Sequence, residues 1–290
     1  MIAPPIPLPR GALSDPEATL PPNLARVRRR FSPDCLRHGT YLANRLIGAG
    51  SMGVVLAAVD RTSARPVAMK VMVERGDRDD ARRFIEEARL TRSLDHPNVV
   101  PVYDLGVNEH DQVFYTMKLI DGISLRAALD LLRAGDRDTV AKYSLRFLVT
   151  VFLKVCDAIA FAHHQGVLHR DLKPDNIMLG RFGEVFVVDW GLARLLDEAT
   201  PAPRERTGTP SHMAPEQLRG DSDRIDRRSD IFSLGVILHQ ILTLALPGAA
   251  APAARPAPPA LTAIAAKALS AEPADRYQSV WAMQRDIETW

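Results

Sequence analysis

One eight-residue stretch of the chain combines the side chains that phosphoryl transfer needs. Residues 169–176 read HRDLKPDN. Asp171 could accept the proton of an attacking hydroxyl, and Lys173 could neutralise the negative charge that develops on a transferred phosphoryl group. Asn176 offers a neutral oxygen to Mg²⁺ without adding further negative charge. A featureless polar loop would rarely carry this run by chance, so the stretch predicts a catalytic loop.

A second ligand for magnesium follows Asn176 at a short distance along the chain. Asp189 comes directly after the apolar run Val185–Val188 and is followed by Trp190 and Gly191. The Asp189 carboxylate is expected to hold a Mg²⁺ ion that bridges nucleotide phosphates, and Gly191 gives the backbone freedom to turn. Magnesium is the expected metal because the protein ligands are few hard oxygens, with phosphates and water completing the shell.

A glycine-rich segment fits a phosphate-binding loop. Residues 48–55 read GAGSMGVV, which matches the spacing G-x-G-x-x-G-x-V. Dinucleotide-binding folds share this glycine spacing, but they need a helix after the loop, whereas residues 54–59 read as a strand. Taken alone, a plain glycine turn explains the segment equally well. As a hairpin tip it would cover phosphates with backbone N–H groups from Gly48, Ala49, Gly50, Ser51 and Gly53.

A lysine and a glutamate are expected to form an ion pair beside the nucleotide. Lys70 ends the apolar run VAMK, where a lysine would ordinarily be a solvated edge residue. Glu87 lies one helical turn after Phe84, which places it on the helix face that packs against the sheet. We therefore favour Glu87 over Glu86 as the partner, with the reverse assignment left open. The pair would hold Lys70 against the α- and β-phosphates.

The pattern of the sequence indicates that a sheet region and a helical region position these residues. Short apolar runs separated by turns indicate an antiparallel sheet, with a charged helix over residues 79–94. Beyond Gly122 the periodicity becomes helical, and Gly166 is placed to end the helix that precedes the catalytic loop. The expected fold class is α+β: a small antiparallel-sheet N-lobe with one key helix, a larger mainly helical C-lobe, and a ligand cleft between them. The five expected strands are Tyr41–Ile47, Val54–Asp60, Pro66–Val73, Val99–Asn108 and Val113–Ile120.

Composition narrows the class of protein. The 290 residues are 46% hydrophobic and 25% charged, which is typical of a globular protein, and a net charge of +2 argues against nucleic acid as a partner. The longest apolar stretch, residues 231–247, is interrupted by His239 and Gln240 and predicts a buried helix, not a membrane span. Prolines near the N-terminus argue against a signal peptide. The two cysteines, Cys35 and Cys156, favour a reducing cytoplasmic location.

Together these motifs resemble the eukaryotic-like serine/threonine protein kinases, and in particular their bacterial branch. The resemblance covers about residues 41–290 and includes the A-P-E motif at residues 214–216. It implies transfer of the γ-phosphate of MgATP to serine or threonine hydroxyls of proteins, including the chain itself. A pseudokinase scaffold that binds nucleotide and partners without efficient turnover is the alternative. The presence of every named catalytic residue argues against it.

The resemblance also implies an adenine site and two structural pairs. The backbone at Lys118, Leu119 and Ile120 would form the hinge that contacts adenine. Glu216 is expected to pair with Arg276, and Asp230 to anchor the backbone of the catalytic loop. The side chains implied to surround the adenine ring are Met117, Val55, Ala68 and Met178.

Three threonines and an arginine suggest specificity and regulation. Thr209, together with Lys173, resembles the serine/threonine branch instead of the tyrosine branch. Arg170 lies directly before the catalytic aspartate and suggests control by a phosphate on the activation segment, the stretch between residues 191 and 214. A buried arginine gains a partner when a nearby threonine is phosphorylated. Thr207 is the favoured site of autophosphorylation, and Thr200 is the second candidate.

The sequence departs from the family pattern at three places. Trp190 replaces the usual phenylalanine, and His212 stands where a tyrosine is usual. Residues 247–259 form a proline- and alanine-rich linker where the family has a further helix, which would weaken docking of protein substrates. We divide the chain into a Pro/Arg-rich, mostly extended tail at residues 1–37 and a kinase domain at residues 38–290. Its N-lobe ends near residue 120, and its C-lobe spans about residues 121–290.

Overall fold

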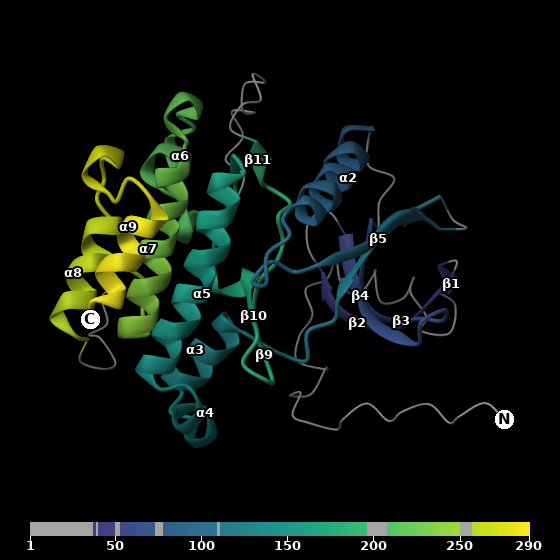
Figure 1. Ribbon diagram of the computed structural model, residues 1–290, viewed down its shortest axis with the longest axis horizontal. Helices are drawn as coiled ribbons and strands as arrows, with labels where there is room; N and C mark the ends of the chain where they lie inside the picture. Colours follow the sequence, from purple (N-terminus) through teal and green to yellow (C-terminus); the bar gives the residue numbers. More distant parts are fainter. Residues whose placement is uncertain are drawn as a thin grey trace.

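The computed structural model describes residues 37–38, 40–49, 53–72, 78–108, 111–195, 208–249 and 257–290. Figure 1 shows two lobes, one built around a curved sheet with a single helix against it and the other mostly helical. The predicted fold class is confirmed. The lobes are joined by the chain segment that follows strand β6 (Val113–Lys118).

The N-lobe is built on a six-stranded antiparallel sheet. Its strand order is β1-β2-β3-β4-β6-β5, so each strand from β1 to β4 pairs with its neighbour in sequence, and β6 inserts between β4 and β5. The predicted helix is α2 (Arg78–Ser93), which has Asp79 and Asp80 in its first turn, where negative charge stabilises a helix N-terminus. The remaining strands are β1 (Arg37–His38), β2 (Tyr41–Ala49), β3 (Gly53–Asp60), β4 (Arg65–Met72) and β5 (Val102–Val107).

Successive side chains of β4 point to opposite faces of the sheet and belong to two different buried clusters. Met69 and its neighbours two positions away lie in one buried cluster with Leu56 and Phe114. The opposite face carries Met72, which packs with Phe84 and Tyr115 in the cluster under α2. Since side chains alternate between faces, Ala68 and Lys70 share the α2 side of the sheet.

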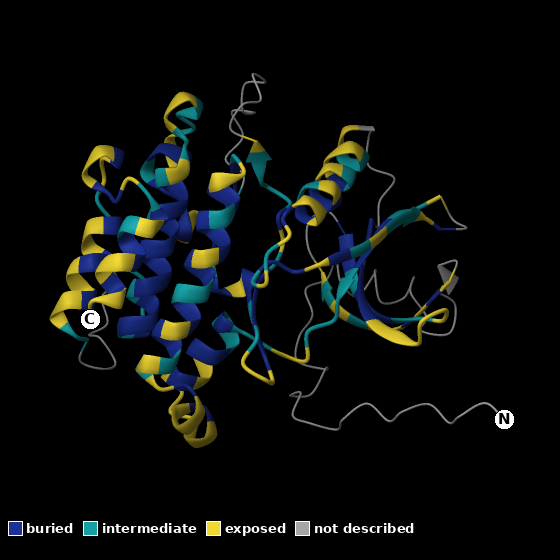
Figure 2. Ribbon diagram, viewed as in Figure 1, coloured by how far each residue is buried: buried dark blue, intermediate teal, exposed yellow. Residues whose placement is uncertain are grey.

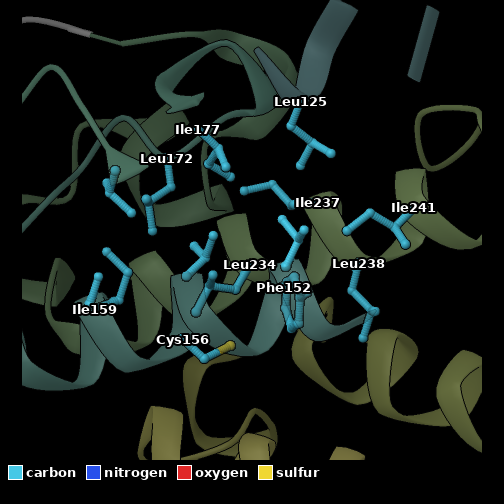
Figure 3. Packing of buried hydrophobic residues seen from close by; sticks show 14 of the residues in the cluster. Leu125, Phe152, Cys156, Ile159, Leu172, Ile177, Leu234, Ile237, Leu238 and Ile241 are labelled. Atoms are coloured by element: carbon cyan, nitrogen blue, oxygen red, sulfur yellow. The ribbon is translucent and has the colours of Figure 1, made fainter. Parts of the chain in front are cut away.

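The C-lobe is organised around two buried helices, α5 (Leu145–His164) and α7 (Arg227–Thr243). Both are mostly buried in Figure 2, and Phe152, Ile159 and Leu234 are among their fully buried side chains. Figure 3 shows side chains of both helices, among them Phe152, Leu234 and Ile237, in one buried cluster. The other helices are α3 (Leu125–Arg133), α4 (Arg137–Lys142), α6 (Pro215–Arg219), α8 (Pro259–Ala268) and α9 (Val280–Glu288).

Two small sheets carry the catalytic segments. Strand β9 (Ile177–Gly180) pairs with both β7 (Gly122–Ser124) and β10 (Val185–Val187), while β8 (Val167–Leu168) pairs with β11 (Arg194–Leu195). In Figure 1 these strands lie between the helices of the C-lobe and the N-lobe.

Several local predictions can be compared with this structure. Gly166 has φ +76° just after α5, as expected for a helix-ending glycine, and the long apolar stretch is the buried helix α7. The described residues contain no helix that is both long and apolar enough to cross a membrane. The edge strand β1 was not predicted, because a two-residue strand leaves no alternation to detect. The tail before residue 37 and most of the 247–259 linker lie outside the described residues.

Candidate active site

Asp171, Lys173 and Thr209 form a closed triangle of hydrogen bonds. Lys173 Nζ donates to Asp171 Oδ2 at 2.7 Å and to Thr209 Oγ1 at 2.8 Å. The Thr209 backbone N–H donates to Asp171 Oδ1 at 2.9 Å. The carboxylate is thus held by donors on both oxygens, and the lysine ammonium lies next to it. This geometry suits a proton acceptor beside a cation.

The two predicted magnesium ligands are brought together by the β9–β10 hairpin. Asn176 precedes β9 and Asp189 follows β10, and the Val188 N–H donates to the Asn176 carbonyl at 2.9 Å. Asn176 Nδ2 donates to the Asp171 carbonyl at 2.9 Å, so its amide oxygen remains an acceptor. One amide oxygen and one carboxylate at the ends of neighbouring strands fit Mg²⁺, which takes few protein ligands when phosphates complete its shell.

Asp189 is strained and charged. Its φ of +61° is in the left-handed region, which is costly for a residue other than glycine and is found mainly where function requires it. Burial would raise the pKa of Asp189, but the Lys70 ammonium 3.2 Å from its Oδ1 outweighs this and lowers the pKa. The carboxylate is therefore ionised at neutral pH, as a metal ligand must be.

Lys70 reaches across to α2 as predicted. Its Nζ lies 2.7 Å from Glu87 Oε1, while Glu86 pairs with Arg82 on the exposed side of the helix. Burial alone would lower the pKa of Lys70, but the Glu87 and Asp189 carboxylates raise it instead. Burial raises the pKa of Glu87, and the hydrogen bonds from Lys70 and Tyr115 oppose that rise. Lys70 is thus a fixed cation at the junction of the lobes.

The side chains predicted to surround adenine lie on adjoining strands. Ala68 is opposite Met117 in the β4–β6 register, and Val55 is opposite Lys70 in the β3–β4 register. Residues directly opposite in antiparallel strands share a face, so these side chains line the same side of the sheet. Met178 is on β9 of the C-lobe, and it and the segment that contains Leu119 are half-buried. Their contact with nucleotide stays a prediction.

The glycine segment forms the ends of a hairpin. Gly48 and Ala49 close β2 opposite Val55 and Val54. At Gly53, which opens β3, a side chain would meet the Val71 carbonyl oxygen at 2.2 Å, so only glycine fits there. A strand and not a helix follows the loop, which removes the dinucleotide-fold alternative. The predicted residues Gly50 and Ser51 lie outside the described part of the chain.

Comparison with known proteins identifies the family of this chain. The protein kinase domain profile matches residues 41–265. The chain belongs to the protein kinase family. It is 37% identical to the serine/threonine-protein kinase PknD of Chlamydia caviae over 287 residues, which is 84% of this chain and 30% of that protein. The PknD proteins of Chlamydia felis and Chlamydia trachomatis serovar L2b are 38% and 36% identical. This kinase chain thus spans about 30% of the length of these curated relatives.

The catalytic loop of the kinase is anchored from below by Asp230. Its Oδ2 accepts from the His169 N–H at 2.9 Å and its Oδ1 from the Arg170 N–H at 2.8 Å. Sequence reasoning gave no role to His163, yet its Nε2 lies 2.8 Å from Asp230 Oδ2. Burial would raise the pKa of Asp230, but the hydrogen bond with His163 and the neighbouring histidine charges lower it.

Arg170 itself is placed to bind an anion. Its backbone has φ +67°, and its Nε is buried without a hydrogen-bond partner among the described residues. Burial lowers the pKa of Arg170, and the neighbouring Arg194 lowers it further. Two guanidinium groups near each other favour a bound anion such as a phosphate. Thr200 and Thr207, the predicted sources of that phosphate, lie outside the described residues.

The two substitutions in the kinase pattern are both accommodated in buried positions. Trp190 is 1% exposed, and its ring centroid lies 4.6 Å from that of His169. It belongs to the C-lobe core, against which Leu90 of α2 also packs. Its Nε1 has no hydrogen-bond partner within the described residues. His212 is 2% exposed and contacts Gln240 of α7.

Proposed function

We propose that this chain is an ATP-dependent protein kinase that phosphorylates serine and threonine hydroxyls of proteins. The observation that carries the proposal is the triangle of Asp171, Lys173 and Thr209. A carboxylate held on both oxygens, with a lysine at its edge, is suited to receiving a hydroxyl proton next to a transferring phosphoryl group. No observation among the described residues favours a scaffold without turnover: Lys70 contacts Glu87, and Lys173 contacts Asp171.

In the proposed reaction a substrate hydroxyl oxygen attacks the terminal phosphorus of ATP. The new P–O bond forms as the bond from that phosphorus to the β–γ bridging oxygen breaks, and ADP leaves. The proton would pass to Asp171 Oδ1, which within the described part of the chain accepts one bond, from the neutral Thr209 N–H, and keeps a lone pair. Lys173 stays protonated and neutralises the transferred group.

The remaining residues position the nucleotide. Lys70, fixed by Glu87, would bind the α- and β-phosphates, and the backbone N–H groups of the glycine hairpin would cover them. Asn176 and Asp189 would hold Mg²⁺, which supplies neutralisation of the phosphate charge when bound. Lys70 Nζ lies 3.2 Å from Asp189 Oδ1, so the lysine of the N-lobe and the carboxylate of the C-lobe would meet the same phosphates.

Substrate and location follow from this chemistry as further parts of the proposal. The acceptor would be a protein hydroxyl, including threonines of the chain itself, since Lys173 binds Thr209 in the way implied for the serine/threonine branch. The reaction uses ATP, so we propose a cytoplasmic setting. The expectation that nucleic acid is not a partner stays a prediction.

The test is transfer of radiolabelled phosphate from ATP to a generic basic protein. The wild type should label it, and Asp171→Asn should lower the rate by orders of magnitude. Asp175→Asn is a matched control in the same loop, because Asp175 makes only a half-exposed contact with Arg126 at 3.5 Å; its rate should match the wild type. A folded wild type that binds an ATP analogue and transfers no phosphate would refute the kinase proposal in favour of a scaffold.

A further inference from the structure

Tyr115 contacts helix α2 with both its ring and its hydroxyl. The hydroxyl donates to Glu87 Oε1 at 2.7 Å. The ring centroid lies 5.2 Å from that of Phe84, one turn earlier on the same helix. Tyr115 is only 3% exposed, so both contacts are shielded from water. None of the motifs in the sequence singles this residue out.

The Glu87 carboxylate is held by hydrogen bonds to only one of its two oxygens among the described residues. Lys70 Nζ and the Tyr115 hydroxyl both donate to Oε1, each at 2.7 Å. Glu87 Oε2 is buried and has no hydrogen-bond partner within the described residues. A buried carboxylate with few donors is costly to keep in place. Without Tyr115, the lysine would be the single remaining donor.

Lys70 is a poor sole anchor, because it has a second partner. Its Nζ also lies 3.2 Å from Asp189 Oδ1, and a nucleotide phosphate would compete for the same ammonium group. Lysine is flexible, whereas a buried tyrosine has two side-chain torsions and a rigid ring. Tyr115 lies directly opposite Lys70 in the β4–β6 register, so sheet pairing sets the distance between them.

We propose that Tyr115 is a positioning residue for phosphoryl transfer. It fixes Glu87, and through Glu87 it keeps Lys70 aimed at the nucleotide phosphates while the lysine is shared with Asp189. The proposal rests on the proposed kinase function for its catalytic readout. It predicts that removing the Tyr115 hydroxyl lowers kcat/KM for ATP, and that this loss requires Glu87.

The experiment compares Tyr115→Phe, Glu87→Ala and the double variant with a matched control. Tyr115→Phe keeps the ring and its contact with Phe84. The control is Tyr41→Phe: Tyr41 is 7% exposed in the same lobe, and its hydroxyl donates to Asp104 Oδ2 at 3.2 Å, away from Glu87. Thermal midpoints check the fold of each variant. Steady-state kinetics with ATP as the varied substrate, and the affinity for a non-hydrolysable ATP analogue with Mg²⁺, give the readouts.

Tyr115→Phe should lower kcat/KM for ATP by about tenfold, the size of a lost hydrogen bond to a charged group. Tyr41→Phe should stay within about twofold of the wild type even where it lowers the thermal midpoint. In the Glu87→Ala background, the tyrosine change should lower kcat/KM by less than about twofold, because the acceptor of the Tyr115 hydroxyl is already gone.

Two results would overturn the proposal: wild-type kcat/KM in Tyr115→Phe, or an equal loss with and without Glu87. An inactive wild type would contradict the kinase function separately. The analogue affinity would then decide the role of Tyr115, with Tyr115→Phe expected to bind several-fold more weakly than Tyr41→Phe, and equal affinities refuting it.

Discussion

Arg276 and Glu216 form a two-pronged ion pair that is closed to solvent. Arg276 Nη1 donates to Glu216 Oε1 at 2.7 Å and Nη2 to Oε2 at 2.8 Å, and both side chains are fully buried. Ser229 adds a bond to Glu216 Oε1. The predicted pair thus joins α6, just after the activation segment, to the turn before α9. Its role is structural.

Breaking this pair should be strongly destabilising. Arg276→Met leaves the Glu216 carboxylate buried without its cation, and we expect a loss of about 3–5 kcal/mol in the free energy of unfolding. Urea unfolding at neutral pH measures this value. Arg224→Met is the control, because Arg224 forms an equally short pair with Glu272 at 2.6 Å but both side chains are about half exposed. That variant should lose less than about 1 kcal/mol. Equal losses in the two variants would contradict the prediction.

Much of the site could be predicted because its motifs are contiguous. Asp171, Lys173 and Asn176 lie within six consecutive residues, so the sequence alone brings them close together. The strand-like run after the glycine segment distinguishes a hairpin from a loop that begins a helix. Glu87 could be chosen over Glu86 because helical periodicity assigns one of them to the sheet side. The Glu216–Arg276 pair joins residues far apart in sequence, and only the family resemblance indicated it.

Other contacts could not be predicted, for physical reasons. Alternation places Phe114 and Tyr115 on opposite faces of β6, but it does not say which face meets α2. That depends on the strand register, which a bulge or turn can shift by one residue. His163 reads as an ordinary residue of an apolar helix, and its contact with Asp230 arises only from the packing of α5 against α7.

Removing the charge of Asp189 should abolish turnover without unfolding the protein. Asp189→Asn keeps the shape of the side chain but removes the carboxylate that Lys70 holds ionised. We expect turnover to fall by orders of magnitude, with a thermal midpoint in the absence of nucleotide close to that of the wild type. Titration with Mg²⁺ at saturating ATP should show that more metal is needed for half-maximal rate. Wild-type turnover in a folded variant would refute the metal assignment.

Incubation with MgATP should place phosphate on the segment before Thr209. Thr207 is the favoured acceptor, because Arg170 has a buried Nε without a partner among the described residues and Arg194 adds positive charge nearby. Mass spectrometry of the peptide Arg204–His212 should detect the phosphate, and Thr207→Ala should remove it or move it to Thr200. Thr209 should stay unmodified, since its hydroxyl accepts from Lys173. An active enzyme without phosphate in this segment would contradict the prediction.

His212 has a polar partner at each of its ring nitrogens. The Gln240 Oε1 atom 2.8 Å from His212 Nε2 can only accept, so Nε2 carries a hydrogen. His212 Nδ1 lies 3.0 Å from the Ser211 hydroxyl, which can either donate or accept. Burial lowers the pKa of His212, and the bond to Gln240 opposes this. The charged groups that act on the ring are Arg126, which lowers the pKa, and Asp175 and Asp171, which raise it.

A lowered histidine pKa makes stability fall as the pH falls. Below about pH 6.5 the unfolded chain binds a proton at residue 212 that the folded protein does not accept until its own lower pKa is reached. The folded state is therefore disfavoured by up to about 1.4 kcal/mol for each pH unit in that interval. Above pH 6.5 both states are neutral at this position, and the contribution is constant.

Replacing His212 with a residue that does not titrate in this range should remove that part of the acid sensitivity. His212→Tyr introduces the residue usual in the family, and His212→Gln is a smaller side chain that can still donate to Gln240. Urea unfolding at pH 7.5 and pH 5.5 gives the change in unfolding free energy for each protein. The wild type should lose more stability between the two values than either variant, although His96, His169 and His239, whose pKa values are also lowered by burial, keep some dependence in all three. The same loss in all three proteins would mean that His212 takes up its proton at the same pH in the folded and unfolded states.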